Sequence, residues 1–388
     1  MAKRESCKTL AIYDDAAVFG GHEQMSCCGI TALARESDLE LKCFVAKSNE
    51  KLRQRIEGFA QDYPNISLHL LDFTSQRFQG VRSRFALGRI GQVAELLRTT
   101  ESDAILVLQG DIELSSIGVL AGRKLGIPTV SYIPVPHTLA TMQAKLGALR
   151  DPFNSWLFSQ PDSYITISEG MKKLLQERGA AQPVEVVFNG FDPSKTEPRD
   201  RELSRKELAL PLDRQVIAMV GRIEYKQKRQ DFLLDCFARY RERFPNLHLM
   251  YVGSGPDEED LKARVAAHEL EDRVTFVAWT DGLSGVYSAI DALALPSRFE
   301  GVPLVMLEAM SREVPIVGSR RDGMAEFLPS EWLFKPGDLA ECADVLSRCL
   351  EEDQSERVRS NRDRALKEFS MEQFDRGFVS ATRKLCRF

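Results

Sequence analysis

The sequence has 388 residues, a formal net charge of −5, and hydrophobic and charged fractions of 43% and 28%. This length exceeds the size at which one hydrophobic core usually keeps growing, so it predicts two domains. The ordinary composition excludes a disordered or fibrous chain. The balanced charge argues against a nucleic-acid-binding protein, because such proteins usually have a basic bias.

The N-terminal segment and the cysteines indicate in which cellular compartment the protein is expected. The first residues lead directly into a strand-like run without a long apolar segment, which predicts neither a signal peptide nor a membrane span. The eight cysteines are scattered and form no Cys-x-x-Cys pair. This pattern favours reduced, mostly buried thiols in a cytoplasmic enzyme over a zinc cage or a disulfide framework.

Short apolar and β-branched runs alternate with longer helical patterns in the first half of the chain, as in βαβ units on a parallel sheet. The expected helices include residues 22–36, 91–98 and 169–178. The expected strands are residues 9–13, 41–45, 67–71, 104–108, 129–133, 163–167 and 184–187. A turn-rich stretch, residues 189–198, follows them and suits a linker between domains.

The alternation resumes after this stretch. The expected strands are residues 216–220, 247–252, 274–277, 292–295 and 316–317, and the expected helices include residues 229–244, 258–269, 339–351 and the amphipathic end of the chain, 355–387. The sequence thus predicts an α/β fold with two Rossmann-like, doubly wound domains that face each other across a cleft. We expect residues 1–192 as the N-terminal domain, with helix 371–388 packing back on it, and residues 193–370 as the C-terminal domain.

The segment Leu293-Ala-Leu-Pro-Ser-Arg-Phe-Glu-Gly-Val-Pro-Leu-Val-Met-Leu-Glu-Ala-Met310 carries the most information. A buried strand runs into a loop, and a helix is expected to begin near Pro303, because proline suits the first helical position. The amides of Gly301, Val302 and Leu304 would then point out of the helix start. A phosphate or a sugar hydroxyl can use amides in that position.

Glu308 lies about one and a half turns into the expected helix, among apolar residues. A carboxylate in such surroundings is costly unless it is hydrogen-bonded, and a vicinal diol is a good partner for it. The spacing alone supports equally well a glutamate that caps the helix or forms a salt bridge within the core.

The motifs along the chain resemble those of the retaining glycosyltransferases of family 4, in that family's order. Glu300 and Glu308 are separated by seven intervening residues and, with the flanking Leu-Pro-Ser-x-x-Glu-Gly and Leu-Glu-Ala-Met, resemble the family's donor signature. Met219-Val-Gly-Arg-Ile223 and the following Lys228-Arg-Gln resemble the segment whose Arg and Lys hold the donor diphosphate. Further similar segments are Phe19-Gly-Gly-His-Glu23, Ile165-Thr-Ile-Ser-Glu169, Val186-Val-Phe-Asn-Gly-Phe-Asp192 and Tyr251-Val-Gly-Ser-Gly-Pro256.

The resemblance implies the GT-B fold and the transfer of a hexose or N-acetylhexosamine from a UDP- or GDP-linked sugar to a hydroxyl, with retention of configuration. It implies no metal or other cofactor, and no Asp-x-Asp stands where a metal-dependent donor site would need it. The N-terminal domain would bind a saccharide, lipid-linked or small-molecule acceptor, and the C-terminal domain the donor. The resemblance also implies that the protein takes part in glycan, polysaccharide or glycolipid biosynthesis, in the cytoplasm or at the inner face of the membrane.

The resemblance also implies roles for single residues. Glu300 would bond hydroxyls of the donor sugar, and Glu308 the ribose diol. Arg222 and Lys228 would offset the charge that develops on the leaving diphosphate. The alternative without a function is that both are solvated cations on the surface. Lys226 competes with Lys228, because Arg222 and Lys228 are one residue further apart than in the commonest family spacing.

Four further positions complete the expected site. Gly20 and Gly21 follow the first strand, where missing side chains let the backbone approach a ligand, although a tight turn would need the same residues. His137 resembles the family histidine that reaches the reacting sugar, although a histidine after a strand also serves as a loop or capping residue. Trp279 stands in a segment that normally lies beside the nucleotide base.

Two segments leave their structure open. Ser311-Arg-Glu313 stands where the family usually has a glycine, which puts the turn before the next strand in question. Residues 77–89 are basic with interleaved Phe78 and Phe85. They fit an acceptor-side or anionic membrane surface, but a solvated helix with its aromatic side chains in the core is the favoured interpretation.

Two other functions stay open. Sugar-nucleotide epimerases and phosphorylases share two-domain folds of this kind, and an epimerase would change the sugar without releasing the nucleotide. A catalytically silent sugar-nucleotide-binding subunit would bind a donor without turnover. The intact set of Arg222, Lys228, Glu300 and Glu308 argues against such a subunit.

Overall fold

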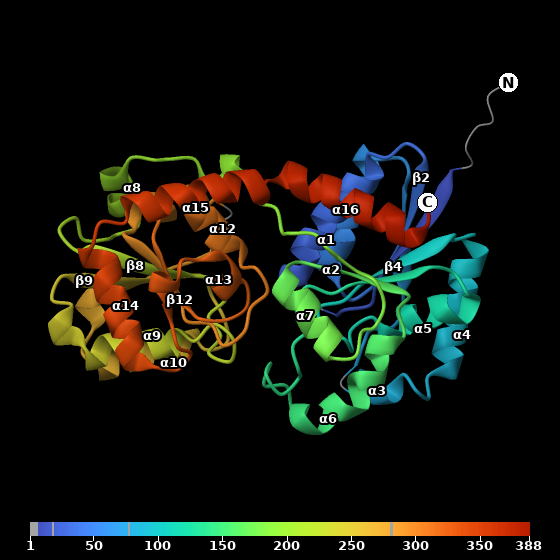
Figure 1. Ribbon diagram of the computed structural model, residues 1–388, viewed down its shortest axis with the longest axis horizontal. Coiled ribbons are helices and arrows are strands. Elements are labelled where there is room, and N and C mark those ends of the chain that lie inside the picture. Colours follow the sequence, from blue (N-terminus) through green and yellow to red (C-terminus); the bar gives the residue numbers. More distant parts are fainter. Residues whose placement is uncertain (1–6, 18, 77, 280–281) are drawn as a thin grey trace. The chain divides into compact units, whose positions relative to one another are not determined.

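The computed structural model describes residues 7–17, 19–76, 78–279 and 282–388 (Figure 1). The chain forms two compact units, each built around its own parallel sheet. Unit 1 runs to Gly190 and includes Glu372–Phe388, and unit 2 comprises Phe191–Met371. Helices and parallel strands alternate in both, so the predicted α/β class with two doubly wound sheets is confirmed.

Unit 1 contains a seven-stranded sheet in the order β3-β2-β1-β4-β5-β6-β7. Its strands are β1 (Lys8–Asp14), β2 (Leu39–Ala46), β3 (Ile66–Leu71), β4 (Ala104–Leu108), β5 (Thr129–Tyr132), β6 (Ser163–Thr166) and β7 (Val184–Val186). Its helices are α1 (Gly21–Ala34), α2 (Glu50–Asp62), α3 (Gln79–Arg82), α4 (Leu87–Thr99), α5 (Ser116–Leu125), α6 (Gly147–Asn154), α7 (Glu169–Glu177) and α16 (Met371–Cys386).

Unit 2 contains a six-stranded sheet in the order β10-β9-β8-β11-β12-β13. Its strands are β8 (Gln215–Val220), β9 (Leu247–Val252), β10 (Val274–Val277), β11 (Ala292–Leu295), β12 (Ile316–Ser319) and β13 (Leu333–Phe334). Its helices are α8 (Arg201–Glu207), α9 (Gln230–Arg239), α10 (Glu258–Ala267), α11 (Ser284–Ala289), α12 (Leu304–Ser311), α13 (Asp322–Phe327), α14 (Leu339–Glu351) and α15 (Ser355–Glu368).

The central strands are nearly continuous apolar runs because helices cover both faces of each sheet. Every residue of β4 and of β9 is buried, for example. Such continuous apolar runs are what the sequence pattern detected. The short edge strand β13 was missed, since two residues make no recognisable run.

The strand order reverses once in each sheet, between β1 and β4 in unit 1 and between β8 and β11 in unit 2. In open parallel sheets, ligands bind outside the carboxyl ends of the strands at such a switch point. The segments that follow Asp14 in unit 1, and Val220 and Leu295 in unit 2, therefore occupy the places where a ligand is expected.

The last helix, α16, packs on unit 1 through aromatic residues. The ring of Phe378 lies edge-on to Tyr132 with centroids 5.5 Å apart. A Cβ atom on Gly29 of α1 would come within 2.5 Å of the Phe378 ring, so only glycine permits this approach. Ion pairs from Asp375 to Arg35 and from Lys384 to Glu185, both at 2.6 Å, flank the contact.

The helical end of the chain, residues 355–387, is divided into α15 and α16. Phe369 is buried edge-on against Phe327, and its carbonyl accepts a hydrogen bond from the Phe191 amide at 2.9 Å. This backbone contact takes a carbonyl that a continuous helix would need for itself. No helix in the described part of the chain is long and apolar enough to cross a bilayer.

Candidate functional site

The loop after β8 is held close to the loop after β9. Gly221 has a φ of 139°, in the region that favours glycine, and a Cβ on Gly253 would lie 2.2 Å from the Gly221 carbonyl oxygen. The buried Gln230 then fixes the next residues: its amide donates to the Arg222 carbonyl at 2.9 Å and accepts from the Glu224 amide at 3.2 Å. Arg222 is thereby placed directly beyond the carboxyl end of β8.

Lys228 and Glu300 form an ion pair across the switch point of unit 2. The Lys228 ammonium lies 2.6 Å from Glu300 Oε1, and the side chains keep only 21% and 7% of their surface exposed. The backbone also joins the two loops, because the Arg298 amide donates to the Gln227 carbonyl at 2.7 Å. A charge-assisted hydrogen bond of this kind fixes both side chains more firmly than a neutral one would.

The two competing lysines differ in their surroundings. Lys228 is paired with Glu300, whereas Lys226 is exposed, and within the described residues no side chain pairs with it. Arg222 is likewise exposed, with no ion-pair partner among the described side chains. The structure thus brings Lys228 and Glu300 together and leaves the Arg222 guanidinium turned to solvent.

The first residues of α13, after β12, also support the Glu300 segment. The Glu300 amide donates to Asp322 Oδ2 at 2.9 Å, and the Gly323 amide donates to the Gly301 carbonyl at 3.0 Å. A Cβ on Gly323 would lie 2.4 Å from the Gly301 carbonyl oxygen, so a larger residue would push the two loops apart. Asp322, which the sequence did not single out, is therefore a support of this site.

The helix expected to begin near Pro303 begins one residue later, at Leu304. Pro303 is the N-cap of α12, with φ −62° and an extended ψ of 127°, and α12 begins at Leu304. An N-cap residue keeps a non-helical backbone, and proline tolerates this ψ as well as it tolerates a helix. The first N–H groups of α12 still lack partners inside the helix, so the Leu304 end remains suited to an anion or a hydroxyl.

Glu308 is a hydrogen-bonded carboxylate rather than a cap. The Tyr287 hydroxyl, on α11, donates to Glu308 Oε2 at 2.7 Å. Burial raises the pKa of Glu308, while the Tyr287 hydrogen bond and the charge of Lys195 oppose that rise. Tyr287 is 3% exposed, and no motif around Glu308 predicted this partner, because Tyr287 lies 21 residues away in the chain.

The turn after α12 forms without the glycine that the family usually has. Glu313 takes the left-handed conformation itself, with φ 55°. The Glu313 amide donates to Met310 at 3.2 Å and the Val314 amide donates to Ala309 at 3.0 Å, which is the hydrogen-bond pattern of a Schellman motif. A non-glycine residue there costs on the order of 1–2 kcal/mol, and β12 follows with its register intact.

Trp279 lies two residues beyond β10 and keeps 52% of its surface exposed. Strand β10 is the edge strand of the sheet, separated by β9 from β8. Trp279 therefore follows the edge strand and not one of the two strands at the switch point. Within the described residues, no group of three His, Cys, Asp or Glu side chains is placed to hold a metal ion.

In unit 1, the expected Gly20 and Gly21 form the start of α1. Gly20 is the N-cap, and its amide donates to Glu23 Oε2 at 2.6 Å, which is one half of a capping box. Gly21 is the first helical residue. His137 is half-buried in the segment that follows β5, on the carboxyl side of the sheet.

Sequence reasoning missed a buried polar cluster at the end of β1. Asp15 Oδ1 accepts hydrogen bonds from the Ser75 hydroxyl at 2.5 Å and from the Ser115 amide at 3.1 Å, and Asp15 Oδ2 accepts from Tyr13 at 2.9 Å. Burial raises the pKa of Asp15 and these bonds oppose the rise. The pair Asp14-Asp15 directly after a strand was the available signal.

Comparison with known proteins identifies the family. Residues 214–352 match the model described as "Glycosyl transferases group 1", and residues 47–195 match the model described as "Glycosyltransferase Family 4". The chain is a family 4 glycosyltransferase. The matched ranges include β8 to β12 with Lys228, Glu300 and Glu308 in unit 2, and the segment of unit 1 that ends with β7.

This glycosyltransferase is similar to curated proteins over part of their length. It is 29% identical to the 2-deoxystreptamine glucosyltransferase of Streptomyces kanamyceticus over 70% of this chain and 74% of that protein. It is 31% identical to the D-inositol 3-phosphate glycosyltransferase of Mycobacteroides abscessus over 53% of this chain, a match that spans 49% of that protein.

Solved structures share the fold at low identity. The Anabaena protein HepE in complex with UDP superposes with a TM-score of 0.77 at 19% identity, covering 97% of this chain and 100% of that chain. Sucrose-phosphate synthase from Thermosynechococcus elongatus superposes with a TM-score of 0.75 at 19% identity, covering 97% and 99%. These superpositions support the GT-B fold.

Proposed function

We propose that this glycosyltransferase moves a hexose or N-acetylhexosamine from a UDP- or GDP-linked donor to a hydroxyl acceptor, with retention of the anomeric configuration. The observation that carries the proposal is the Lys228–Glu300 ion pair at 2.6 Å, at the switch point of unit 2. A cation beside an oriented carboxylate, next to the start of α12, offers one group to a diphosphate and another to sugar hydroxyls. UDP-glucose is the first donor to test, since HepE was solved with UDP-glucose and a similar curated protein is a glucosyltransferase.

The residues of unit 2 would divide the donor between them. Lys228 and the exposed Arg222 would bind the diphosphate and offset the charge that grows on it as the sugar leaves. Glu300 would accept hydrogen bonds from sugar hydroxyls, with amides of Gly301 to Leu304 beside it. Glu308, oriented by Tyr287 through Oε2, would present its second oxygen to the ribose diol.

The proposed reaction is a front-face displacement. The bond from the anomeric carbon to the diphosphate oxygen breaks while the bond from that carbon to the acceptor oxygen forms on the same face. The acceptor proton passes to the leaving phosphate oxygen, so no protein nucleophile and no metal ion is part of the proposal. Gly20, Gly21, His137 and Trp279 keep the roles implied by the resemblance as predictions.

The proposal places the reaction in the cytoplasm or at the inner face of a membrane, in glycan, polysaccharide or glycolipid biosynthesis. The acceptor would be a saccharide, a lipid-linked sugar or a small molecule bound by unit 1. These assignments rest on the family resemblance and on what similar proteins do.

Proton NMR of the reaction provides the main test. Incubation with UDP-glucose and an acceptor panel should release UDP and give a product with the anomeric configuration of the donor. Glu300→Gln should slow turnover by about 10²-fold. An inverted product, or full activity in Glu300→Gln, would overturn the proposal. Incubation without acceptor separates the epimerase alternative, which would convert the sugar and release no UDP.

Tyr287→Phe should move the acid limb of donor binding to higher pH. The Tyr287 hydrogen bond lowers the pKa of Glu308 against the effect of burial, so its loss raises that pKa further. The carboxylate is then protonated at a higher pH, and affinity for UDP-glucose falls earlier as the pH is lowered. Calorimetric titration across the acidic range measures the shift.

Glu308→Gln is the matched control, because it removes the titrating group and should flatten this limb. Identical pH profiles for Tyr287→Phe and the unmodified protein would contradict the role of Tyr287.

A further inference from the structure

Helix α6 (Gly147–Asn154) exposes its apolar side chains and buries its polar ones. Leu149 and Phe153 keep 66% and 56% of their surface exposed, whereas Asn154 is fully buried and the Arg150 side chain keeps 11%. A helix on the surface of a globular protein normally has the opposite arrangement, with its apolar stripe facing the core. This inversion calls for a partner that is itself apolar.

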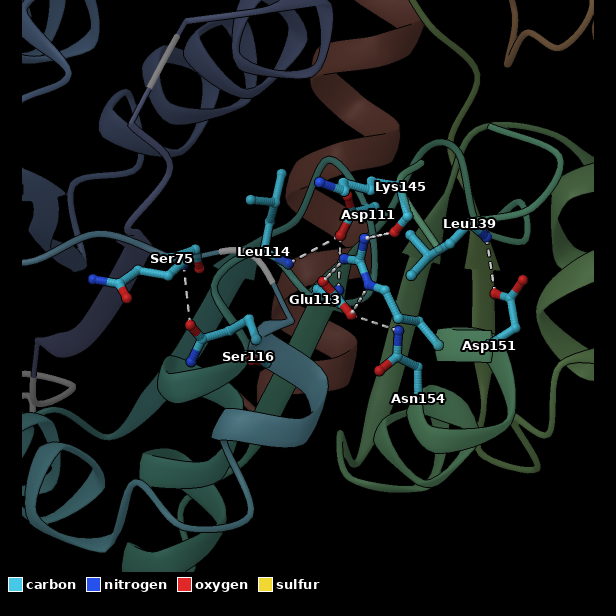
Figure 2. Close-up of polar contacts among 12 residues, drawn as sticks. Ser75, Asp111, Glu113, Leu114, Ser116, Leu139, Lys145, Asp151 and Asn154 are labelled. Atoms are coloured by element: carbon cyan, nitrogen blue, oxygen red, sulfur yellow. Dashed lines mark hydrogen bonds and ion pairs between the residues drawn. The ribbon is translucent and has the colours of Figure 1, made fainter. Parts of the chain in front are cut away.

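A buried polar network holds α6 in this orientation, as Figure 2 shows. Glu113, in the segment after β4, accepts from Arg150 Nε at 3.3 Å, pairs with Arg150 Nη2, and accepts from Asn154 Nδ2 at 2.7 Å. Asp151 accepts from the Leu139 amide at 2.8 Å and from Arg178 at 3.2 Å. Turning α6 over would leave these charges buried without partners, so its apolar face is fixed outward.

A second exposed apolar segment belongs to the same end of unit 1. Phe85, between α3 and α4, and Leu87, the first residue of α4, are 80% and 74% exposed. Helix α3 contacts α6 (Figure 1). Two cation–π contacts join the segments: Arg150 lies 4.9 Å from the Phe78 ring centroid, and Arg84 lies 5.1 Å from that of Trp156. We call the exposed apolar set the docking surface; its members are Phe85, Leu87, Leu146, Leu149 and Phe153.

The docking surface is bordered by positive charge. Residues 78–94 contain three arginines and no Asp or Glu, and the arginines Arg82, Arg84 and Arg89 are all exposed. Residues 138–150 also contain no Asp or Glu and include the exposed Lys145. The chain as a whole has a net charge of −5. The local charge is therefore opposite in sign to that of the molecule.

We propose that the docking surface seats unit 1 on a bilayer that contains anionic lipid. Phenylalanine and leucine side chains insert at the boundary between headgroups and acyl chains, while arginine and lysine beside them attract anionic headgroups. Exposed apolar side chains grouped in this way mark an interaction site on a soluble domain, and the basic border selects an anionic membrane. The inference is independent of the donor chemistry proposed above.

The structure also corrects the favoured interpretation of residues 77–89. Phe85 is exposed rather than buried in the core, and Phe78 is half-buried under Arg150. The reason is that the segment forms only the single-turn helix α3 before α4 begins, so Phe85 lies between the two helices. Arg77 lies outside the described residues.

Vesicle flotation tests the proposal. The full-length protein should float with vesicles of phosphatidylcholine and phosphatidylglycerol, weakly or not at all with vesicles of phosphatidylcholine alone, and less in high salt. Phe85→Ser with Leu149→Ser and Phe153→Ser should lower the partition coefficient at least about tenfold. Lys145→Glu should lower it about fivefold or more, the effect of one basic residue near an anionic surface.

Matched controls lie on unit 2. Leu203 and Leu212 are 50% and 51% exposed, and Leu203→Ser with Leu212→Ser should leave flotation unchanged. Lys367→Glu, at another exposed lysine, controls for charge. Binding of UDP-glucose and the melting temperature should stay the same in all variants.

Three outcomes would overturn the proposal: no flotation of the unmodified protein, equal loss in the controls and the docking-surface variants, or a docking-surface variant that turns a dimer into a monomer without affecting flotation. The last outcome would assign the surface to a second copy of the chain.

Discussion

Lys228→Met should lower kcat/KM for transfer from UDP-glucose by about 10²- to 10³-fold, the usual cost of removing one group that stabilises a developing negative charge. The Lys228 side chain keeps 21% of its surface exposed, and its ammonium lies 2.6 Å from Glu300 Oε1. The ammonium is therefore held in place before the donor binds. Its loss removes a cation from the proposed diphosphate position and leaves the nearly buried Glu300 without its counter-ion. Both effects oppose the binding and departure of a diphosphate.

Lys226→Met provides a control of the same chemistry two residues away. Lys226 is exposed and has no ion-pair partner among the described residues, so its replacement should change kcat/KM less than about threefold. Steady-state kinetics on both variants decides between the two lysines. A large loss in Lys226→Met with little change in Lys228→Met would reverse the assignment.

Glu113→Leu should destabilise the β4–α6 region of unit 1 by about 3–5 kcal/mol, the usual cost of removing one partner from a buried ion pair. The Glu113 and Arg150 side chains keep 6% and 11% of their surface exposed, and Asn154 also donates to Glu113. Without Glu113, the Arg150 charge stays buried and uncompensated. Hydrogen exchange measured by mass spectrometry should become about 10²- to 10⁴-fold faster in peptides from α6.

Glu95→Leu is the matched control for a surface pair. Glu95 and Arg98 are 56% and 66% exposed, and an ion pair so open to water contributes little to stability. Exchange in α6 should be unchanged in this variant, and peptides from unit 2 serve as an internal reference in both. Unaltered α6 protection in Glu113→Leu would show that other contacts fix this helix.

Much of the fold was readable from the sequence because its signal is local. Strands buried on both faces are continuous apolar runs, and strands β4, β9, β10 and β11 begin and end where the pattern placed them. Short elements without a strong sequence pattern were not predicted. Strand β13 is two residues long, and α3 is a single turn.

The candidate site was readable where its residues lie close together in the chain. The loop after β11 and the start of α12 carry Glu300 and Glu308 within one segment, so motif and spacing sufficed to find them. Residues that hold these carboxylates from more distant segments could not be found in this way, because no local motif connects them to the site. Tyr287 and Asp322 reach Glu308 and the Glu300 amide from 21 and 22 residues away in the chain.

The sequence by itself determined the α/β class, the two doubly wound sheets, the family and the candidate carboxylates, because each depends on neighbouring residues. The tertiary structure alone decided which lysine pairs with Glu300, since loops after β8 and β11 meet only in the folded sheet. The tertiary structure also decided which face of α6 is exposed. A helical sequence pattern shows which residues share a face, but it does not show which face is buried. The polar face of α6 is buried against Glu113, which comes from the distant segment after β4.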